Sequence, residues 1–380
     1  MNSVVIVGSG LAGASVAREL RKIDSAVSIV IVASDDGDFY SKPNLSNALA
    51  AGKAPAQLVA TPRAVFAEQQ RIEIRAHTRV DAILPGEHAL QTSAGRIAYS
   101  RLVLAVGAQP IRLPIEGNGA GDVLAVNNMA DYTVFRQRLA GKRRVAILGA
   151  GLIGCEFAND LAGAAYAVDV FDLAPQPLGR LLPAAAADHF RRQLEAAGVR
   201  FHFGTSIGRV DRTDDGLILL DLKGNEFAAD LVLSAVGLRP ETALARAAGL
   251  ATNRGITVDS RLATSDADIF AVGDCAEVQG LVLPFVLPIM QQARALAKTL
   301  AGTPTAVAYP AMPVVVKTPA CPTVVCPPPA GNAGAWREDA SAAGVRAVFE
   351  DATGAAIGFA LLGDAMKEKQ ALAAHMPPWL

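Results

Sequence analysis

Short apolar runs of strand length recur along the chain and alternate with segments of helical periodicity. The first run covers residues 4–7, a helix is predicted over 11–22, and a second apolar run covers 28–32. The same order returns later, with strand, helix and strand predicted over 145–148, 155–161 and 167–171. Strand, helix and strand in this order form a βαβ unit with parallel strands. The pattern therefore predicts an α/β fold with two Rossmann-like units.

Three glycines in the first unit have the spacing of a dinucleotide-binding loop. Gly8 is expected to make the tight turn, Gly10 to let the backbone approach a pyrophosphate, and Gly13 to let helix and strand pack closely. Asp35 follows the second strand, where an acid accepts hydrogen bonds from a ribose diol. A glycine-rich packing turn is the alternative for a lone GxGxxG. The complete order of strand, glycines, helix, strand and acid favours a dinucleotide.

The second unit repeats this pattern with Gly149, Gly151 and Gly154, followed by Asp172. An acid at this position favours NADH, because an NADPH site needs a cation for the 2′-phosphate. Arg180, eight positions further on, weakens that preference. Two dinucleotide sites in one chain leave room for one Rossmann unit inserted within the other.

Further strands and helices complete each unit and form a tail. Strands are expected near 71–76, 89–92, 102–106, 199–203, 217–222 and 231–236, and helices over 184–197 and from Pro288 to 300. The closures before Gly107 and Gly237 match as repeats, and Gly273–Asp274 ends another strand. In the tail, strands are expected at 313–317, 323–326, 345–349 and 356–361, and a helix at 366–374. The predicted domains are 1–110 with 248–310, then 111–247, then a small α+β domain over 311–380.

Composition limits the possible partners. The 380 residues are 51% hydrophobic and 19% charged, with a formal net charge of -1, which gives no reason to expect nucleic acid. No apolar window is long enough to span a membrane, and the N-terminal run breaks at Gly8 instead of continuing as a signal peptide, so a cytoplasmic location is expected. The four cysteines form no zinc pattern and are expected to be free, buried thiols. A redox pair of Cys321 and Cys326 is disfavoured, because the apolar residues between them indicate a strand.

Several segments resemble the two-dinucleotide-binding flavoprotein reductases, and more closely the bacterial rubredoxin-NAD(+) reductases. They are Tyr-Ser-Lys-Pro at 40–43, the second glycine loop and its helix at 149–158, Val-Gly-Leu-Arg-Pro at 236–240, Gly-Asp-Cys-Ala-Glu at 273–277 and Val-Lys-Thr-Pro-Ala-Cys-Pro at 316–322. The resemblance covers essentially the whole chain. It implies two nested dinucleotide domains and a C-terminal domain, with FAD in the first unit, NADH in the second and rubredoxin as the electron acceptor.

The resemblance also implies which residues contact the two cofactors. For FAD they are Gly8, Gly10, Leu11, Ala12, Gly13, Ser34, Asp35, Lys42, Pro43, Val80, Gly107, Gly273, Asp274, Val286 and Lys317. For NADH they are Gly149, Gly151, Ile153, Gly154, Glu156, Asp172 and Gly237.

Lys42 and Lys317 are implied as the catalytic cations, whose charge would favour the reduced flavin, although surface lysines with snorkelling side chains are the simpler reading. The helix from Pro288 would direct its positive end at the pyrimidine side of the flavin. Glu156 is implied to orient the nicotinamide. Its alternative is a favourable charge in the first helical turn.

The absence of a cysteine from residues 41–46 separates this chain from relatives that have a redox thiol there. Electrons are then expected to leave the flavin directly: hydride passes from NADH to flavin N5, and single electrons pass to rubredoxin iron. Alternatives are a reductase of ferredoxin or flavorubredoxin, or a flavin-containing redox-sensing binding protein. Rubredoxins are acidic, and candidates for a basic docking surface are Lys53, Arg63, Arg71, Arg75 and Arg79. Ordinary solvated charges explain the same five residues.

Overall fold

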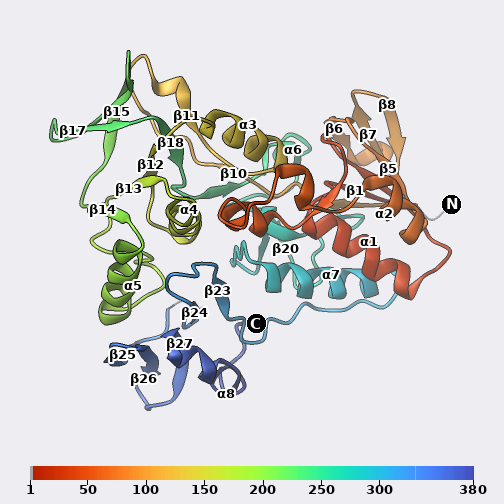
Figure 1. Cartoon of the computed structure of the whole chain (residues 1–380). Helices are drawn as coiled ribbons and strands as arrows, with labels where there is room; N and C mark the ends of the chain where they lie inside the picture. The colour runs from red at the N-terminus through yellow and green to blue at the C-terminus, as the bar shows by residue number, and fades with distance from the viewer. Residues whose placement is uncertain (1–2, 330) are drawn as a thin grey trace.

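Two parallel five-stranded sheets dominate the computed structural model, which describes residues 3–329 and 331–380 (Figure 1). The first sheet has the strand order β21-β9-β1-β2-β5. Its strands are β1 (Ser3–Val7), β2 (Ser28–Val32), β5 (Glu73–Arg75), β9 (Arg101–Leu104) and β21 (Ile269–Ala271). The apolar residues of β1 are buried from Val4 to Val7, as expected for a central parallel strand covered on both faces.

The second sheet repeats this arrangement with the order β11-β18-β12-β13-β14. Its strands are β11 (Val123–Leu124), β12 (Arg144–Leu148), β13 (Ala167–Asp172), β14 (Val199–Phe203) and β18 (Leu231–Ser234). All neighbouring strands in both sheets are parallel. The predicted α/β fold with two Rossmann-like sheets is therefore confirmed.

The second sheet is inserted into the first. The chain leaves the first sheet after β9, builds the whole second sheet, and returns to place β21 beside β9. The outgoing segment β10 (Ala108–Pro110) and the returning segment β19 (Leu238–Pro240) pair as a two-stranded antiparallel ribbon. Gly107 and Gly237, the two matching closures, directly precede these strands. The domain boundaries drawn near residues 110 and 247 stay predictions.

Helices cover the sheets. They are α1 (Leu11–Ile23), α2 (Arg63–Gln70), α3 (Met129–Leu139), α4 (Leu152–Gly163), α5 (Ala184–Ala196), α6 (Ala243–Ala247) and α7 (Val286–Leu300). Figure 1 shows α1 and α7 side by side against the first sheet. The predicted start of α7 at Pro288 is wrong, because the helix begins at Val286. A proline at the third position is tolerated, since the first four helical N–H groups have no partner within the helix.

The C-terminal segment forms an antiparallel sheet with the order β23-β24-β27-β26-β25. The strands are β23 (Val314–Val316), β24 (Thr323–Cys326), β25 (Gly334–Ser341), β26 (Gly344–Asp351) and β27 (Ala356–Gly363). The single helix predicted over 366–374 is wrong: a 3₁₀ turn, η6 (Asp364–Glu368), precedes a short helix, α8 (Lys369–Ala373). A buried cluster of apolar side chains runs without interruption from the second sheet into this one, through Phe157, Val316 and Val345.

Smaller sheets and turns lie outside these three five-stranded sheets. They are β3 (Phe39–Tyr40) with β4 (Val59–Thr61); β6 (Val80–Leu84), β7 (Ala89–Thr92) and β8 (Gly95–Ala98); β15 (Ile207–Thr213), β16 (Gly216–Asp221) and β17 (Glu226–Ala229); β20 (Ile256–Val258) with β22 (Ala276–Val278); and the 3₁₀ turn η1 (Lys42–Asn47). Across residues 3–329 and 331–380, the structure has no helix with the length and hydropathy needed to cross a lipid bilayer.

Candidate functional site

The first glycine loop lies between β1 and α1. Gly8 has a φ of +113°, and a Cβ on it would lie 2.3 Å from the carbonyl oxygen of Ala105. A Cβ on Gly13 would lie 2.0 Å from the carbonyl oxygen of Gly8, so helix and loop are in direct backbone contact. A Cβ on Gly10 would meet no atom within 4 Å. The loop is thus closed against the protein at two glycines and open at the third.

The second glycine loop has the same geometry. A Cβ on Gly149 would lie 2.6 Å from the carbonyl oxygen of Ala235, and one on Gly154 would lie 1.9 Å from that of Gly149. A Cβ on Gly151 would again meet nothing within 4 Å. Both loops therefore present an open backbone at the N-terminus of a helix, which is the geometry that receives a diphosphate.

The two acids predicted to bind ribose each contact their own glycine loop. The hydroxyl of Ser9 donates a hydrogen bond to Asp35 Oδ1 at 3.0 Å, and the amide of Gly37 donates to the same oxygen at 3.0 Å. The amide of Ala150 donates to Asp172 Oδ2 at 2.5 Å, and that of Ala174 to Asp172 Oδ1 at 2.7 Å. Each acid thus holds the end of its second strand against the loop, and its role toward ribose stays a prediction.

Lys42 and Asp274 are partly buried side chains whose opposite charges act on each other. Burial lowers the pKa of Lys42, while the negative charge of Asp274 opposes that shift. Burial raises the pKa of Asp274, while Lys42 opposes that shift. Lys42 Nζ donates to Asn127 Oδ1 at 2.6 Å, and Asn127 in turn donates to the carbonyl oxygen of Ala108 at 2.8 Å. Lys42 is therefore a fixed, partly desolvated cation, not a snorkelling surface lysine.

Glu156 lies deeper than expected. The sequence pattern predicts Glu156 in the first turn of its helix, but α4 begins at Leu152 and Glu156 is its fifth residue, so the favourable-dipole explanation is wrong. Its side chain is 0% exposed and forms an ion pair with the ammonium group of Lys317. The hydroxyl of Ser46 donates to Glu156 Oε2 at 2.5 Å, and the amide of Lys317 donates to Oε1 at 3.0 Å. Lys317 therefore contacts Glu156 where η1, α4 and the end of β23 meet, and it is not an ordinary surface lysine.

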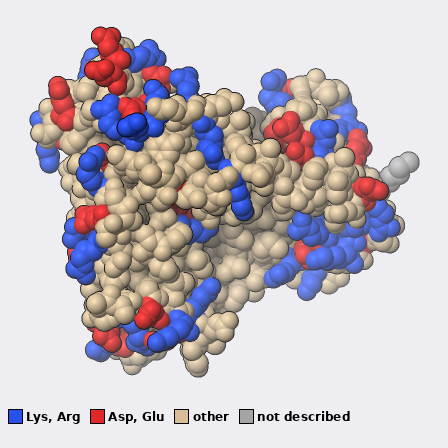
Figure 2. Space-filling model, viewed as in Figure 1, with Lys and Arg blue, Asp and Glu red and all other residues tan. Residues whose placement is uncertain are grey.

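The other predicted cofactor contacts lie on several elements. Leu11 and Ala12 begin α1, Pro43 lies in η1, Val80 begins β6, Ile153 lies in the first turn of α4, Val286 begins α7, and Gly273 and Asp274 lie in a 3₁₀ turn (Gly273–Cys275) after β21. Ser34 is exposed beside Asp35. Figure 2 shows a hollow between the lobe that carries β6 to β8 and the lobe that carries β15 to β17. The cofactor contacts themselves stay predictions.

All four cysteines are free and buried, as the sequence predicts. Burial raises the pKa of Cys275 to about 12 and that of Cys321 and Cys326 to about 11, and it raises the pKa of Cys155 as well. The Cys275 thiol donates to the carbonyl oxygen of Val272 at 3.2 Å. These thiols are protonated at neutral pH, which makes them poor nucleophiles.

The five basic residues that are candidates for docking lie on different elements. Lys53 lies beside α3, where its carbonyl oxygen accepts a hydrogen bond from Arg136, whereas Arg63 begins α2 and Arg71 follows its last residue. Arg75 pairs with Glu73 and Arg79 pairs with Asp81. Figure 2 shows Lys and Arg side chains gathered over the face that carries α1 and α2.

Sequence reasoning missed Ser46, Asn127 and Asp160. Asp160 is buried and accepts hydrogen bonds from the amides of Leu49 and Ala50 at 2.9 and 2.8 Å. The only available signal was the placement of Asp160 on the apolar, buried helix that also carries Glu156. The contact of Ser46 with Glu156 joins residues 110 positions apart, and that of Asn127 with Lys42 joins residues 85 positions apart, so no local pattern marks them.

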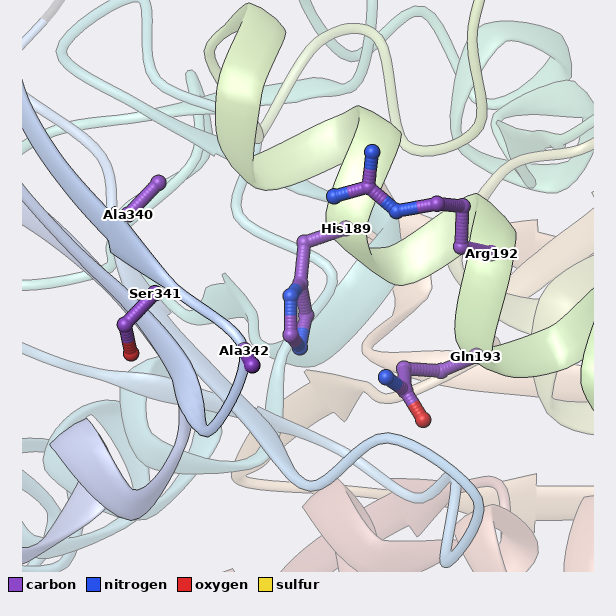
Figure 3. Close-up of a pocket in the computed structure, with 6 residues that line it drawn as sticks. All are labelled: His189, Arg192, Gln193, Ala340, Ser341 and Ala342. Atoms are coloured by element: carbon purple, nitrogen blue, oxygen red, sulfur yellow. The ribbon is translucent and has the colours of Figure 1, made fainter.

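A separate hollow of about 520 Å³ lies between α5 and the β25–β26 turn (Figure 3). It is lined by His189, Arg192, Gln193, Ala340, Ser341 and Ala342. Burial, followed by the charge of Arg192, lowers the pKa of His189. None of the predicted cofactor residues lines this hollow.

Comparison with known proteins agrees with the fold. The sequence profile of the pyridine nucleotide-disulphide oxidoreductase family matches residues 2–299, and the chain therefore belongs to that family. A profile described as a rubredoxin binding C-terminal domain matches residues 306–376. The rubredoxin-NAD(+) reductase of Acinetobacter baylyi is 47% identical over 96% of this chain and 94% of its own length. The resemblance to the bacterial rubredoxin-NAD(+) reductases is thereby confirmed.

Two further proteins are similar over nearly the whole chain. The nitric oxide reductase FlRd-NAD(+) reductase of Aeromonas hydrophila is 40% identical over 98% of this chain and 96% of its own length. Among solved structures, a ferredoxin reductase from Rhodopseudomonas palustris superimposes with a TM-score of 0.90 at 30% identity, covering 99% of this chain and 96% of the other. The architecture, including the C-terminal sheet, is thus common to reductases of different electron carriers.

Proposed function

We propose that this chain is an FAD-dependent NADH:rubredoxin oxidoreductase. One arrangement carries the proposal: two nested parallel sheets, each with an open glycine loop, joined to a C-terminal sheet that the rubredoxin-binding profile matches. FAD, when bound, would accept a hydride from NADH at N5 and release electrons singly, which joins a two-electron donor to a one-electron iron carrier. The protein supplies position and electrostatics for this exchange.

The first loop and its surroundings fit FAD. The open backbone at Gly10 and the N-terminus of α1 would receive the diphosphate, with Asp35 beside the ribose. Asp274 would hold the ribityl and pyrophosphate part. Lys42, kept in place by Asn127, would supply a fixed positive charge next to the flavin, and Lys317 would supply a second. These cations would favour the electron-rich reduced ring.

The second loop fits NADH. The open backbone at Gly151 would receive the diphosphate, and Asp172 at the end of β13 disfavours the 2′-phosphate of NADPH. Glu156 would orient the nicotinamide ring. Because the four cysteines are buried and their pKa values are raised, electrons would pass to the carrier without a thiol relay.

A second carrier is favoured by one observation. The Aeromonas hydrophila relative, 40% identical over 98% of this chain, is named as a reductase of FlRd. The flavorubredoxin class of carrier is therefore the alternative to a free rubredoxin. The alternative that is not an enzyme is a flavin-containing, redox-sensing binding protein. Slow reduction of its flavin by NADH would identify it.

The test begins with the purified protein. It should be yellow or take up FAD, lose its flavin absorbance rapidly on anaerobic mixing with NADH, and turn over when oxidised rubredoxin is added. Rubredoxin, flavorubredoxin and ferredoxin should be compared at low and high salt. We expect rubredoxin to react fastest and its rate to fall with salt, since an acidic carrier is attracted by charge. A protein that refuses FAD, or one that reduces ferredoxin faster, would contradict the proposal.

A further inference from the structure

Helix α4 carries three buried polar side chains on one face. Glu156, Asn159 and Asp160 are 0%, 8% and 3% exposed, and their spacing of three and four residues places them on the same side of the helix. Each of them contacts a segment far away in the sequence. Asp160 accepts from two amides that follow η1, and Asn159 accepts from the amide of Ala320 at 3.0 Å. Helix α4 is therefore an element through which both the first unit and the C-terminal sheet are attached to the second unit.

The carboxylate of Glu156 is nearly saturated with donors. Ser46 Oγ lies 2.5 Å from Oε2, the amide of Lys317 lies 3.0 Å from Oε1, and Lys317 Nζ pairs with Oε2. An ionised carboxylate has about four acceptor positions, so about one is not used by these three donors. Three donors from two other segments also fix the direction of that remaining position.

We infer that Ser46 is a positioning residue of the nicotinamide site, and that the C-terminal sheet, through Lys317, completes the same site. The inference rests on the proposed function, in which Glu156 faces the nicotinamide. Ser46 has one hydroxyl proton and two acceptors in reach, Glu156 at 2.5 Å and the carbonyl oxygen of Pro43 at 3.2 Å. The shorter distance and the charge of the acceptor favour Glu156.

This arrangement couples the nicotinamide site to the attachment of the C-terminal sheet. Lys317 reaches the surface, with its side chain 23% exposed, whereas Glu156 is 0% exposed. Lys317 also lines a hollow of about 200 Å³ together with Asn47 and Met366. Tighter attachment of segment 317–320 to α4 keeps the Glu156 carboxylate in the orientation that binds nicotinamide. By thermodynamic linkage, bound NAD(H) must tighten that attachment by the same factor.

The first experiment compares Ser46→Ala, Ser46→Thr and the control Ser25→Ala in the FAD-loaded enzyme. Ser25 is exposed and lies outside the site. Calorimetric titration with NAD+ should show a dissociation constant raised about tenfold by Ser46→Ala, the effect of losing one hydrogen bond to a charged group. Ser46→Thr keeps the hydroxyl and should restore binding, and Ser25→Ala should match the wild type. The KM for NADH should rise more than kcat falls.

The second experiment uses Asn159→Ala, which removes the acceptor for Ala320 and leaves every donor to Glu156 in place. Hydrogen exchange of the Lys317 and Ala320 amides should slow when NAD+ binds to the wild type. In Asn159→Ala the Ala320 amide should exchange faster, and NAD+ should bind more weakly.

Two results overturn the inference: folded, FAD-loaded Ser46→Ala that binds NAD+ as the wild type does, or exchange at Lys317 that is indifferent to NAD+. If the wild type reduces rubredoxin while either result is obtained, only the inference fails. If the wild type takes up no FAD or reduces no carrier, the proposed function fails with it.

Discussion

Within the four residues from Gly151 to Gly154, one glycine should be needed for folding and the other for cofactor binding. In Gly154→Ala the new methyl carbon would lie 1.9 Å from the carbonyl oxygen of Gly149, whereas an ordinary contact begins at 3.4 Å. Helix and loop would have to separate by about 1.5 Å, the difference between these two distances, and the neighbouring atom is backbone that cannot rotate away. Overpacking of this kind costs about 1–3 kcal/mol.

Gly151→Ala is the matched variant. Its methyl group would meet no protein atom within 4 Å, and the φ of -74° at this position suits alanine. Because Gly151 is the N-cap of α4 and alanine is a poorer N-cap than glycine, the free energy of unfolding should fall by at most about 1 kcal/mol. The methyl would, however, occupy the space in which the diphosphate of NADH is proposed to lie. The affinity for NAD+ should fall at least about tenfold, which corresponds to ~1.4 kcal/mol.

Thermal unfolding and calorimetric titration with NAD+ measure the two effects separately. Gly154→Ala should unfold at a lower temperature than the wild type, while Gly151→Ala should unfold near the wild-type temperature and bind NAD+ poorly. The reasoning would be refuted if Gly154→Ala were as stable as the wild type, or if Gly151→Ala bound NAD+ with wild-type affinity. Gly10→Ala and Gly13→Ala provide the same comparison for FAD.

Three further predictions concern charge and thiols. Although burial raises it, hydrogen bonds from His202 and Arg200 lower the pKa of Asp169 from 3.8 to about 2. The ionised Asp169 should therefore add about 2 kcal/mol to the free energy of unfolding above pH 4, and this contribution is lost as the pH falls toward 2. In urea unfolding, Asp169→Asn should be less stable than the wild type at pH 7, and the two proteins should become equally stable in acid. Asp172→Ala removes the acceptor for the Ala150 amide and a charge beside the proposed ribose site, and steady-state kinetics should show the preference for NADH over NADPH reduced about tenfold or more; an unchanged preference would exclude this role. A thiol reagent should react slowly with the native protein and leave carrier reduction intact, because the pKa values of the buried thiols are raised, and rapid loss of turnover on labelling would show that a thiol takes part.

The parallel sheets could be predicted because their strands are continuous apolar runs followed by glycine loops. β2 and β14 of the parallel sheets have the predicted bounds, and so do β7 and β24 of two antiparallel sheets. β25 could not be predicted, because it is an edge strand whose side chains are nearly all exposed, so it has no alternating pattern. β6 and β8 were also missed, since the first is only partly buried and the second has one buried residue.

The site was only partly predictable for a different reason. The glycines and the acids follow local spacing, and the structure places them in two equivalent loops. The contacts of Glu156 join residues 110 and 161 positions apart, and no periodicity encodes such pairs. The resemblance to known reductases indicated that Glu156 and Lys317 matter, but it did not indicate that they bind each other.

The nested order of the sheets also bears on how the polypeptide matures. β21, the edge strand beside β9, and α7, which packs on α1, emerge from the ribosome only after every strand of the inserted sheet has been made. The second sheet can therefore form while the first still lacks its edge strand β21 and the helix α7. Nascent chains halted when residue 250 has left the ribosome, but β21 has not, should resist protease in the inserted part and remain cleavable in the part that began synthesis first.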